Sequence, residues 1–241
     1  MYNDAMYYLK TSEELLNPLR VFVSDKEYVK FYIKSVIGDK YNVPTLKILE
    51  TAEDIDAYAF PSDCCIKPTH SSGMVVFREG GEPLNLHGIK NWLRLNYYKR
   101  LREPNYQYLK PKIIVEPLIF SSTSPADYKV YCYNGVPKAI AVVQDRQTSH
   151  KNLLLDAEWN ALGYSIRYPL YEGDLEKPEN FDEMMDVSRK LSKAFDGFIR
   201  VDLYSNGKEL KVGELTNLSG GAESIFLPAS AEGKFARLLF E

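Results

Sequence analysis

Residues 200–217, RVDLYSNGKELKVGELTN, predict two short strands joined by a tight turn. Apolar and polar residues alternate along both halves of this segment, which is the period of a half-buried strand. Asn206-Gly207 lies between the halves and is a strong hairpin signal, because both residues tolerate a positive φ. The pattern therefore predicts a β-hairpin.

The length of the turn decides which side chains share a face of this hairpin. A two-residue turn places Asp202 opposite Lys211 and sends Glu214 to the other face. A three-residue turn instead puts Arg200, Asp202 and Glu214 on one face. Two carboxylates and a guanidinium would be costly in a dry core, but they suit a divalent cation and a phosphate. A solvated hairpin whose charges simply face water is the alternative.

Composition and charge exclude several classes of protein. The 241 residues are 45% hydrophobic and 26% charged, which is typical of a globular protein of one large domain or two small lobes. A net charge of −3 argues against general nucleic-acid binding. The chain has no apolar run of transmembrane length and no signal-peptide pattern at its N-terminus. We therefore expect a cytoplasmic protein with no membrane span, in which Cys64, Cys65 and Cys132 are reduced and buried.

The first half of the chain predicts two helices and a strand–loop–strand unit, and the second helix and the strand each carry a lysine that could bind phosphate. Residues 11–19 predict a short leader helix, and residues 24–37 predict a second helix with Ser24 and Glu27 as a capping box and Lys26 in its first turn. Residues 64–77 predict an apolar strand that carries Lys67, a loop of small residues and a returning strand. Such a loop can wrap phosphates with backbone N–H groups and hydroxyls. Surface lysines and a plain hairpin are the alternative interpretation.

The middle of the chain predicts a long helix over residues 86–102 and a buried strand over residues 112–120 that Glu116-Pro117 interrupts. A carboxylate inside an apolar strand needs a partner, and proline ends a central ladder, so this point is a candidate hinge between two lobes. Residues 127–133 and 136–143 predict a second hairpin, in which Asp127 and Lys129 share a face.

The order of these motifs resembles the TupA-like (teichuronopeptide-biosynthesis) ATP-grasp family from about residue 20 to the end of the chain. The resemblance implies an α+β fold in which two lobes with mainly antiparallel sheets clasp ATP. It implies a leader helix over residues 1–24, a first lobe over 25–117 and a second lobe over 118–241. The nucleotide-binding residues that it implies are Lys26 and Lys67 at the α- and β-phosphates, Ser71, Ser72 and Gly73 in the phosphate loop, Glu116 with the backbone of Leu118 and Ile119 at adenine, and Asp127 at the ribose.

The same resemblance implies a Mg²⁺ site and two residues for the chemistry. Asp202 and Glu214 would hold the metal, Arg200 would stabilise the transferring phosphoryl group, and Lys129 would bind phosphate or an acyl phosphate. The family's asparagine two residues beyond the glutamate is replaced here by Thr216, with Asn217 beside it, so either could be a further ligand. Most ATP-grasp enzymes also carry a substrate domain before the clasp, and only a leader segment precedes Lys26, which leaves the acceptor site open.

The resemblance implies an ATP-dependent carboxylate–amine ligase that forms ADP. Its context is surface-polysaccharide biosynthesis, where an amino acid or amine would be joined to a sugar acid, in possible association with polysaccharide assembly enzymes. The alternatives are a small-molecule kinase on the same clasp, or a non-catalytic nucleotide- or glycan-binding protein, or a glycosyltransferase-like protein.

Overall fold

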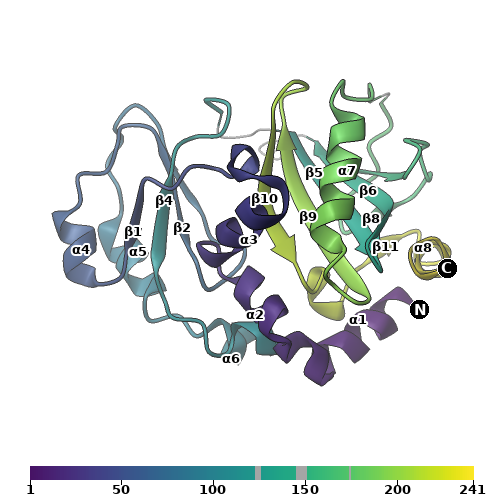
Figure 1. Ribbon diagram of the computed structural model, residues 1–241, viewed down its shortest axis with the longest axis horizontal. Helices are drawn as coiled ribbons and strands as arrows, with labels where there is room; N and C mark the ends of the chain where they lie inside the picture. The colour runs from purple at the N-terminus through teal and green to yellow at the C-terminus, as the bar shows by residue number, and fades with distance from the viewer. Residues whose placement is uncertain (123–125, 145–150, 174) are drawn as a thin grey trace.

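The computed structural model describes residues 1–122, 126–144, 151–173 and 175–241, and Figure 1 shows two sheets side by side, each with helices packed on it. Within these residues the strand orders are β1-β4-β2-β3 in one sheet and β10-β9-β5-β6-β7 in the other, with a small β11-β8 pair. The strands of each sheet pair antiparallel with their neighbours. The fold is therefore the expected α+β arrangement of helices and antiparallel sheets.

The four-stranded sheet comes from the first half of the chain. Its strands and the helices around it are β1 (Lys47–Leu49), β2 (Cys64–Pro68), β3 (Val76–Arg78), β4 (Ile113–Glu116), α4 (Ala52–Ala57), α5 (Leu86–Trp92) and α6 (Tyr97–Leu101), with 3₁₀ turns η2 (Asp39–Tyr41) and η3 (Pro104–Tyr106). Thr51 caps α4 and forms a capping box with Asp54. A small apolar core centred on Ile66 and Val115 holds the sheet to α4 and α5.

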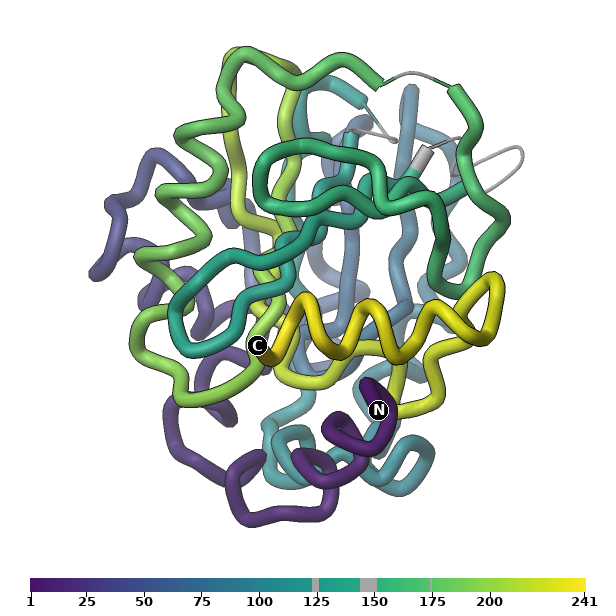
Figure 2. The backbone as a smooth tube through the Cα atoms, turned by 90° about the vertical axis from the view of Figure 1, so that its right-hand side faces the viewer, coloured from purple at the N-terminus to yellow at the C-terminus, as the bar shows by residue number. Residues whose placement is uncertain are grey.

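The five-stranded sheet comes mainly from the second half. Its strands are β5 (Ala126–Tyr133), β6 (Val136–Gln144), β7 (Lys151–Asp156), β9 (Phe198–Ser205) and β10 (Leu210–Thr216), and β8 (Ser165–Ile166) and β11 (Phe226–Leu227) lie beside it. One face packs against α3 (Tyr28–Ile37) and α7 (Phe181–Ser192). Part of the other face is covered by α1 (Tyr2–Thr11) and α8 (Ala231–Phe240), which Figure 2 shows lying close together at the two termini of the chain.

Helix α3 packs on the five-stranded sheet. Val29 and Ile33 of α3 belong to the core of that sheet, together with residues of α7 and β9. The helix therefore lies between the two sheets in Figure 1 and connects them.

The predicted starts of the first two helices are wrong. In place of one helix over residues 11–19, the chain forms α1, a 3₁₀ turn η1 (Glu13–Leu16) and α2 (Pro18–Ser24). Ser12 ends α1, and its hydroxyl accepts a hydrogen bond from the Glu14 N–H, which starts a new turn. The capping box at Ser24 is absent, because the Ser24 hydroxyl donates to the Arg20 carbonyl and Asp25 accepts the N–H groups before α3 instead. Lys26 therefore lies in the turn between α2 and α3.

The helix predicted over residues 86–102 is also wrong, because it is two short helices. α5 ends at Trp92, and Asn96 then caps α6 by accepting a hydrogen bond from the Lys99 N–H at 2.9 Å. The side chain of an asparagine favours such a new helix start over continuation of the old one.

Neither expected turn length for the hairpin of residues 200–217 is correct. The turn spans the four residues 206–209 between the paired Ser205 and Leu210. A bulge then falls between Val212 and Glu214, so that Glu214 lies opposite Asp202 and Thr216 lies opposite Arg200. Because Arg200 and Asp202 are two residues apart in one strand, the bulge brings both carboxylates and the guanidinium to one face.

Other expectations are confirmed. The hairpin of β5 and β6 and the β2–loop–β3 unit form close to their predicted ranges. Cys64, Cys65 and Cys132 are buried and free. In the part of the chain that the structure describes, no helix has the length and apolar character that a membrane crossing requires.

The buried position of Phe235 in α8 gives a test of the fold. Its side chain is 0% exposed and packs with Tyr2 and Tyr131, whereas Phe31 in α3 is 57% exposed. We expect Phe235→Ala to lower the free energy of unfolding by about 3–5 kcal/mol, because it opens a cavity. Phe31→Ala should change it by about 0.5 kcal/mol or less. Urea unfolding measures both, and equal losses would contradict this packing.

Candidate functional site

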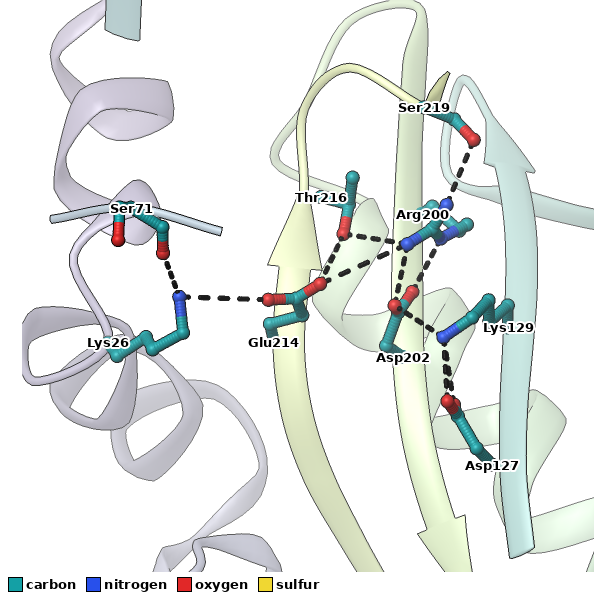
Figure 3. A network of polar contacts seen from close by, with 9 residues as sticks. All are labelled: Lys26, Ser71, Asp127, Lys129, Arg200, Asp202, Glu214, Thr216 and Ser219. Atoms are coloured by element: carbon teal, nitrogen blue, oxygen red, sulfur yellow. Dashed lines mark hydrogen bonds and ion pairs between the residues drawn. The ribbon is translucent and has the colours of Figure 1, made fainter. Parts of the chain in front are cut away.

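A network of charged side chains joins β5, β9 and β10 (Figure 3), on the face of the five-stranded sheet to which Tyr131 and Phe198 also belong. Both oxygens of Asp202 accept hydrogen bonds from Arg200, each at 2.6 Å, and Lys129 lies 3.1 Å from the same carboxylate. Lys129 also pairs with Asp127 at 2.8 Å. Burial raises the pKa of Asp202, but Arg200 and Lys129 outweigh it and hold that pKa below its ordinary value. Asp202 is therefore a buried, ionised carboxylate.

Glu214 lies across from Asp202 on the neighbouring strand β10. Its Oε1 is 3.9 Å from an Arg200 nitrogen and 3.1 Å from the Thr216 hydroxyl. Arg200 also donates to the hydroxyls of Thr216 and Ser219, at 3.2 and 2.9 Å. The Glu214 side chain is 31% exposed, so it is the most open carboxylate of the network.

The structure separates the two candidate ligands that follow Glu214. Thr216 points into the network, as Figure 3 shows. Asn217 is buried on the other side of the strand, where its amide oxygen accepts from Arg20 at 3.1 Å and its amide nitrogen donates to the Arg20 carbonyl and the Ser24 hydroxyl. Both ends of the Asn217 amide are thus engaged away from Asp202 and Glu214.

Lys26 connects the front half of the chain to this network. Its ammonium donates to the carbonyl of Ser71 in the loop after β2 and lies 4.0 Å from Glu214. Burial lowers the pKa of Lys26, and the negative charge of Glu214 opposes that effect. The small-residue loop therefore faces the acidic hairpin from the opposite lobe.

The loop itself has the features of a polar cradle. The Ser71 hydroxyl is buried and has no hydrogen-bond partner among the described residues. Gly73 has a left-handed φ of 79°, a conformation that glycine adopts without strain. Ser72 lies between them and is half-buried. Backbone and hydroxyl groups of such a loop can bind an anion.

Lys67 and Glu116 form a second charged group on the adjacent strands β2 and β4. Glu116 accepts from Lys67 at 2.8 Å and from Lys30 of α3 at 2.5 Å. Burial raises the pKa of Glu116, but the two lysines outweigh it and lower that pKa overall. The buried carboxylate thus has the partner that the sequence required. Leu118 and Ile119 follow in the half-buried segment that leads to the second sheet.

Three neighbours of the site escaped sequence reasoning. Lys30 reaches Glu116 from a helix, Ser219 binds Arg200 from the turn after β10, and Tyr204 lies close enough to Lys67 to raise the pKa of that lysine. The spacing of four between Lys26 and Lys30 is the one signal in the sequence that could have indicated a shared face for the two lysines.

The donor set fits a magnesium ion that is completed by phosphate oxygens. Mg²⁺ in nucleotide sites takes one or two protein carboxylates and otherwise keeps water and phosphate ligands. Asp202 and Glu214 supply such a pair from opposed positions on two strands. The described residues contain no group of three or more His, Cys, Asp or Glu side chains placed to hold a metal without a substrate.

Comparison with known proteins places the chain. A family model described as TupA-like ATPgrasp matches residues 8–235. The solved structure of an L-amino acid ligase from Bacillus licheniformis matches 92% of this chain at 14% identity with a TM-score of 0.51. A D-alanine–D-alanine ligase from Helicobacter pylori matches 84% of it at 14% identity with a TM-score of 0.48. No curated protein matches the chain.

These solved structures are longer proteins. The chain covers 50% of the L-amino acid ligase and 53% of the D-alanine–D-alanine ligase, so it spans about half of their length. At this identity the likeness concerns the fold alone.

Removing the charge of Glu116 tests whether the Lys67–Glu116–Lys30 group is a paired, buried set. Glu116→Gln leaves two partly buried lysines without a counter-charge, and we expect it to lower the free energy of unfolding at pH 7 by about 3–5 kcal/mol. Glu50→Gln, which removes an exposed pair with Lys110, should cost less than about 1 kcal/mol.

The pH dependence of this effect has a definite sign. Because the folded pKa of Glu116 is lowered, its stabilisation is present above the unfolded pKa and is lost as pH falls through the folded value. The difference in the free energy of unfolding between the wild type and Glu116→Gln, measured with urea, should therefore become smaller in acid. Equal stability of Glu116→Gln and Glu50→Gln at pH 7 would contradict the pairing.

Proposed function

Because this chain belongs to the TupA-like ATP-grasp family, we propose that it is an ATP-dependent ligase that joins a carboxylate to an amine and forms ADP and phosphate. One observation carries the proposal: the basic groups of the front half and the acidic groups of the back half meet in one place. Lys26 and the Ser71 loop face Glu214 at 4.0 Å, and Glu214 lies opposite Asp202. A triphosphate with its metal is the ligand that both sets of charges would bind together.

In this proposal different residues bind different parts of the nucleotide. Lys26, Lys67 and the loop of Ser71, Ser72 and Gly73 bind the phosphates. Glu116 and the backbone of Leu118 and Ile119 bind adenine, and Asp127 binds the ribose. Lys67 and Lys30 hold the Glu116 carboxylate in place and lower its pKa, which supports this assignment.

Asp202, Glu214 and Thr216 would hold Mg²⁺, which neutralises charge on the phosphates when it is bound. Arg200 and Lys129 approach the same carboxylate and supply positive charge for the phosphoryl group in transfer. The substrate carboxylate attacks the γ-phosphorus, the bond to ADP breaks, and an acyl phosphate forms. The amine then attacks the acyl carbon, phosphate leaves, and the amide forms with loss of a proton from the amine.

We propose a sugar acid of a surface-polysaccharide precursor as the carboxylate and an amino acid or amine as its partner, on the resemblance to the family. Since the reaction consumes ATP, we expect it in the cytoplasm, and association with polysaccharide assembly enzymes is a part of this proposal. A small-molecule kinase would use the same clasp, while a nucleotide- or glycan-binding module or a glycosyltransferase-like protein would not turn ATP over to ADP.

An ATP-consumption assay separates these functions. A ligase releases phosphate only when a carboxylate and an amine are both present, so we would screen uronic acids against the amino acids and measure free phosphate. A kinase leaves the phosphate on its product, and a binding module releases none. Asp202→Asn should lower the rate by roughly 10²-fold or more, because it weakens metal binding and charge stabilisation.

Two matched variants keep this test interpretable. Glu214→Gln changes the more exposed carboxylate of the pair and should cause a similar loss with an unchanged circular dichroism spectrum. Asp186→Asn changes an exposed carboxylate of α7 outside the site and should leave the rate unchanged. Full activity of Asp202→Asn and Glu214→Gln would overturn the metal assignment.

A further inference from the structure

Glu103 is a buried carboxylate that none of the groups described above uses. It lies between α6 and the 3₁₀ turn η3, and its side chain is buried to 6% exposure. No described residue donates a hydrogen bond to this carboxylate or pairs with it within the 4.0 Å of an ion pair. The positive charge that lowers the pKa of Glu103 is that of Lys10 in α1, whose ammonium donates to the Gly221 carbonyl at 3.1 Å.

An unpaired carboxylate in such a place is costly, because burial removes water without a partner in exchange. Burial raises the pKa of Glu103 to about 7, Lys10 opposes the shift and the nearby Glu214 adds to it. A buried carboxylate with a raised pKa and no partner is typical of functional sites, where a ligand can supply the missing counter-charge. The ligand that would complete Glu103 is a cation with hydrogen-bond donors.

The surroundings of Glu103 place it next to the network. Glu214 acts electrostatically on Glu103, and both carboxylates raise the pKa values of Tyr97 and Tyr106. Asn105 of η3 donates to the Ser24 hydroxyl at 2.8 Å, and Asn217, the residue after β10, donates to the same hydroxyl at 3.1 Å. Because Thr216 lies opposite Arg200, these bonds place η3 at the Arg200 end of the hairpin. In Figure 1, α6 lies beside α2, below the lower end of β10.

We infer that Glu103 binds the ammonium group of the incoming amine substrate, with Tyr97 and Tyr106 lining the approach beside it. The inference rests on the proposed ligase function and names the substrate group that this site would take. The segment of α6 and η3 would then form the surface that binds the amine substrate. This segment packs against η1 and α2. A primary ammonium supplies three N–H donors and one positive charge, which matches an unpaired carboxylate among phenol rings better than a bare metal ion does.

Calorimetry with simple amines tests this inference directly. The probes are the twenty standard amino acids, ethanolamine and putrescine, each titrated with and without a non-hydrolysable ATP analogue and Mg²⁺. We expect the wild type to bind at least one of them and to bind its hydroxy counterpart, in which OH replaces the ammonium, at least tenfold more weakly. Glu103→Gln should weaken binding of that amine by roughly tenfold or more, because a charge-assisted hydrogen bond is lost.

The control is Glu13→Gln, which changes an exposed carboxylate of the neighbouring η1 and should bind the amine like the wild type. Glutamine has nearly the same shape as glutamate and carries no charge. The Glu103→Gln variant should therefore stay folded and keep its affinity for the nucleotide analogue. Glu103→Asp keeps the charge and should recover part of the amine affinity.

The outcomes for the two proposals are distinct. If the wild type does not bind the nucleotide analogue, the ligase proposal fails. The titrations without nucleotide then still test whether Glu103 binds the amine. If Glu103→Gln binds the amine as tightly as the wild type, if the hydroxy counterpart binds equally well, or if no probe binds, the inference about Glu103 is overturned.

Discussion

The bulge at Gly213 is the constraint on which the rest of the site depends. Up to Val212 the register pairs Leu203 with Val212, and without an extra residue Glu214 would pair with Val201 and point toward the core under α7. The bulge moves Glu214 to the face of Asp202 instead. Glycine suits this position, because a Cβ atom on Gly213 would lie 2.6 Å from the ring of Tyr204 and would force that ring to move.

The charged side chains of the site are held by one another before any ligand binds. Asp202 is shared between Arg200 and Lys129, and Glu116 is shared between Lys67 and Lys30. Buried ions of this kind stabilise a fold little by themselves, because desolvation offsets their attraction. These ion pairs keep the positive groups oriented. A bound polyanion with its metal would replace them with stronger interactions, and the side chains would need to move little.

Local patterns were enough to predict much of the fold and part of the site. Period-two alternation located β5, β6, β9 and β10, and the ordered motifs indicated an ATP-grasp clasp with Lys26, Asp202 and Glu214 on facing elements. The register of the hairpin could not be predicted, because it depends on a four-residue turn and a bulge that the alternation of residues does not specify. Lys30 and Glu103 could not be found either, because tertiary packing alone makes one a partner of Glu116 and leaves the other buried without one.

The most direct test is a crystal structure with a non-hydrolysable ATP analogue and Mg²⁺. We expect one nucleotide between the two sheets, with its phosphates touching Lys26, Lys67 and the loop at Ser71. A metal ion should bridge those phosphates to Asp202 and Glu214. A nucleotide whose phosphates contact the lysines of the first half while Asp202 and Glu214 face a different cleft would contradict this expectation.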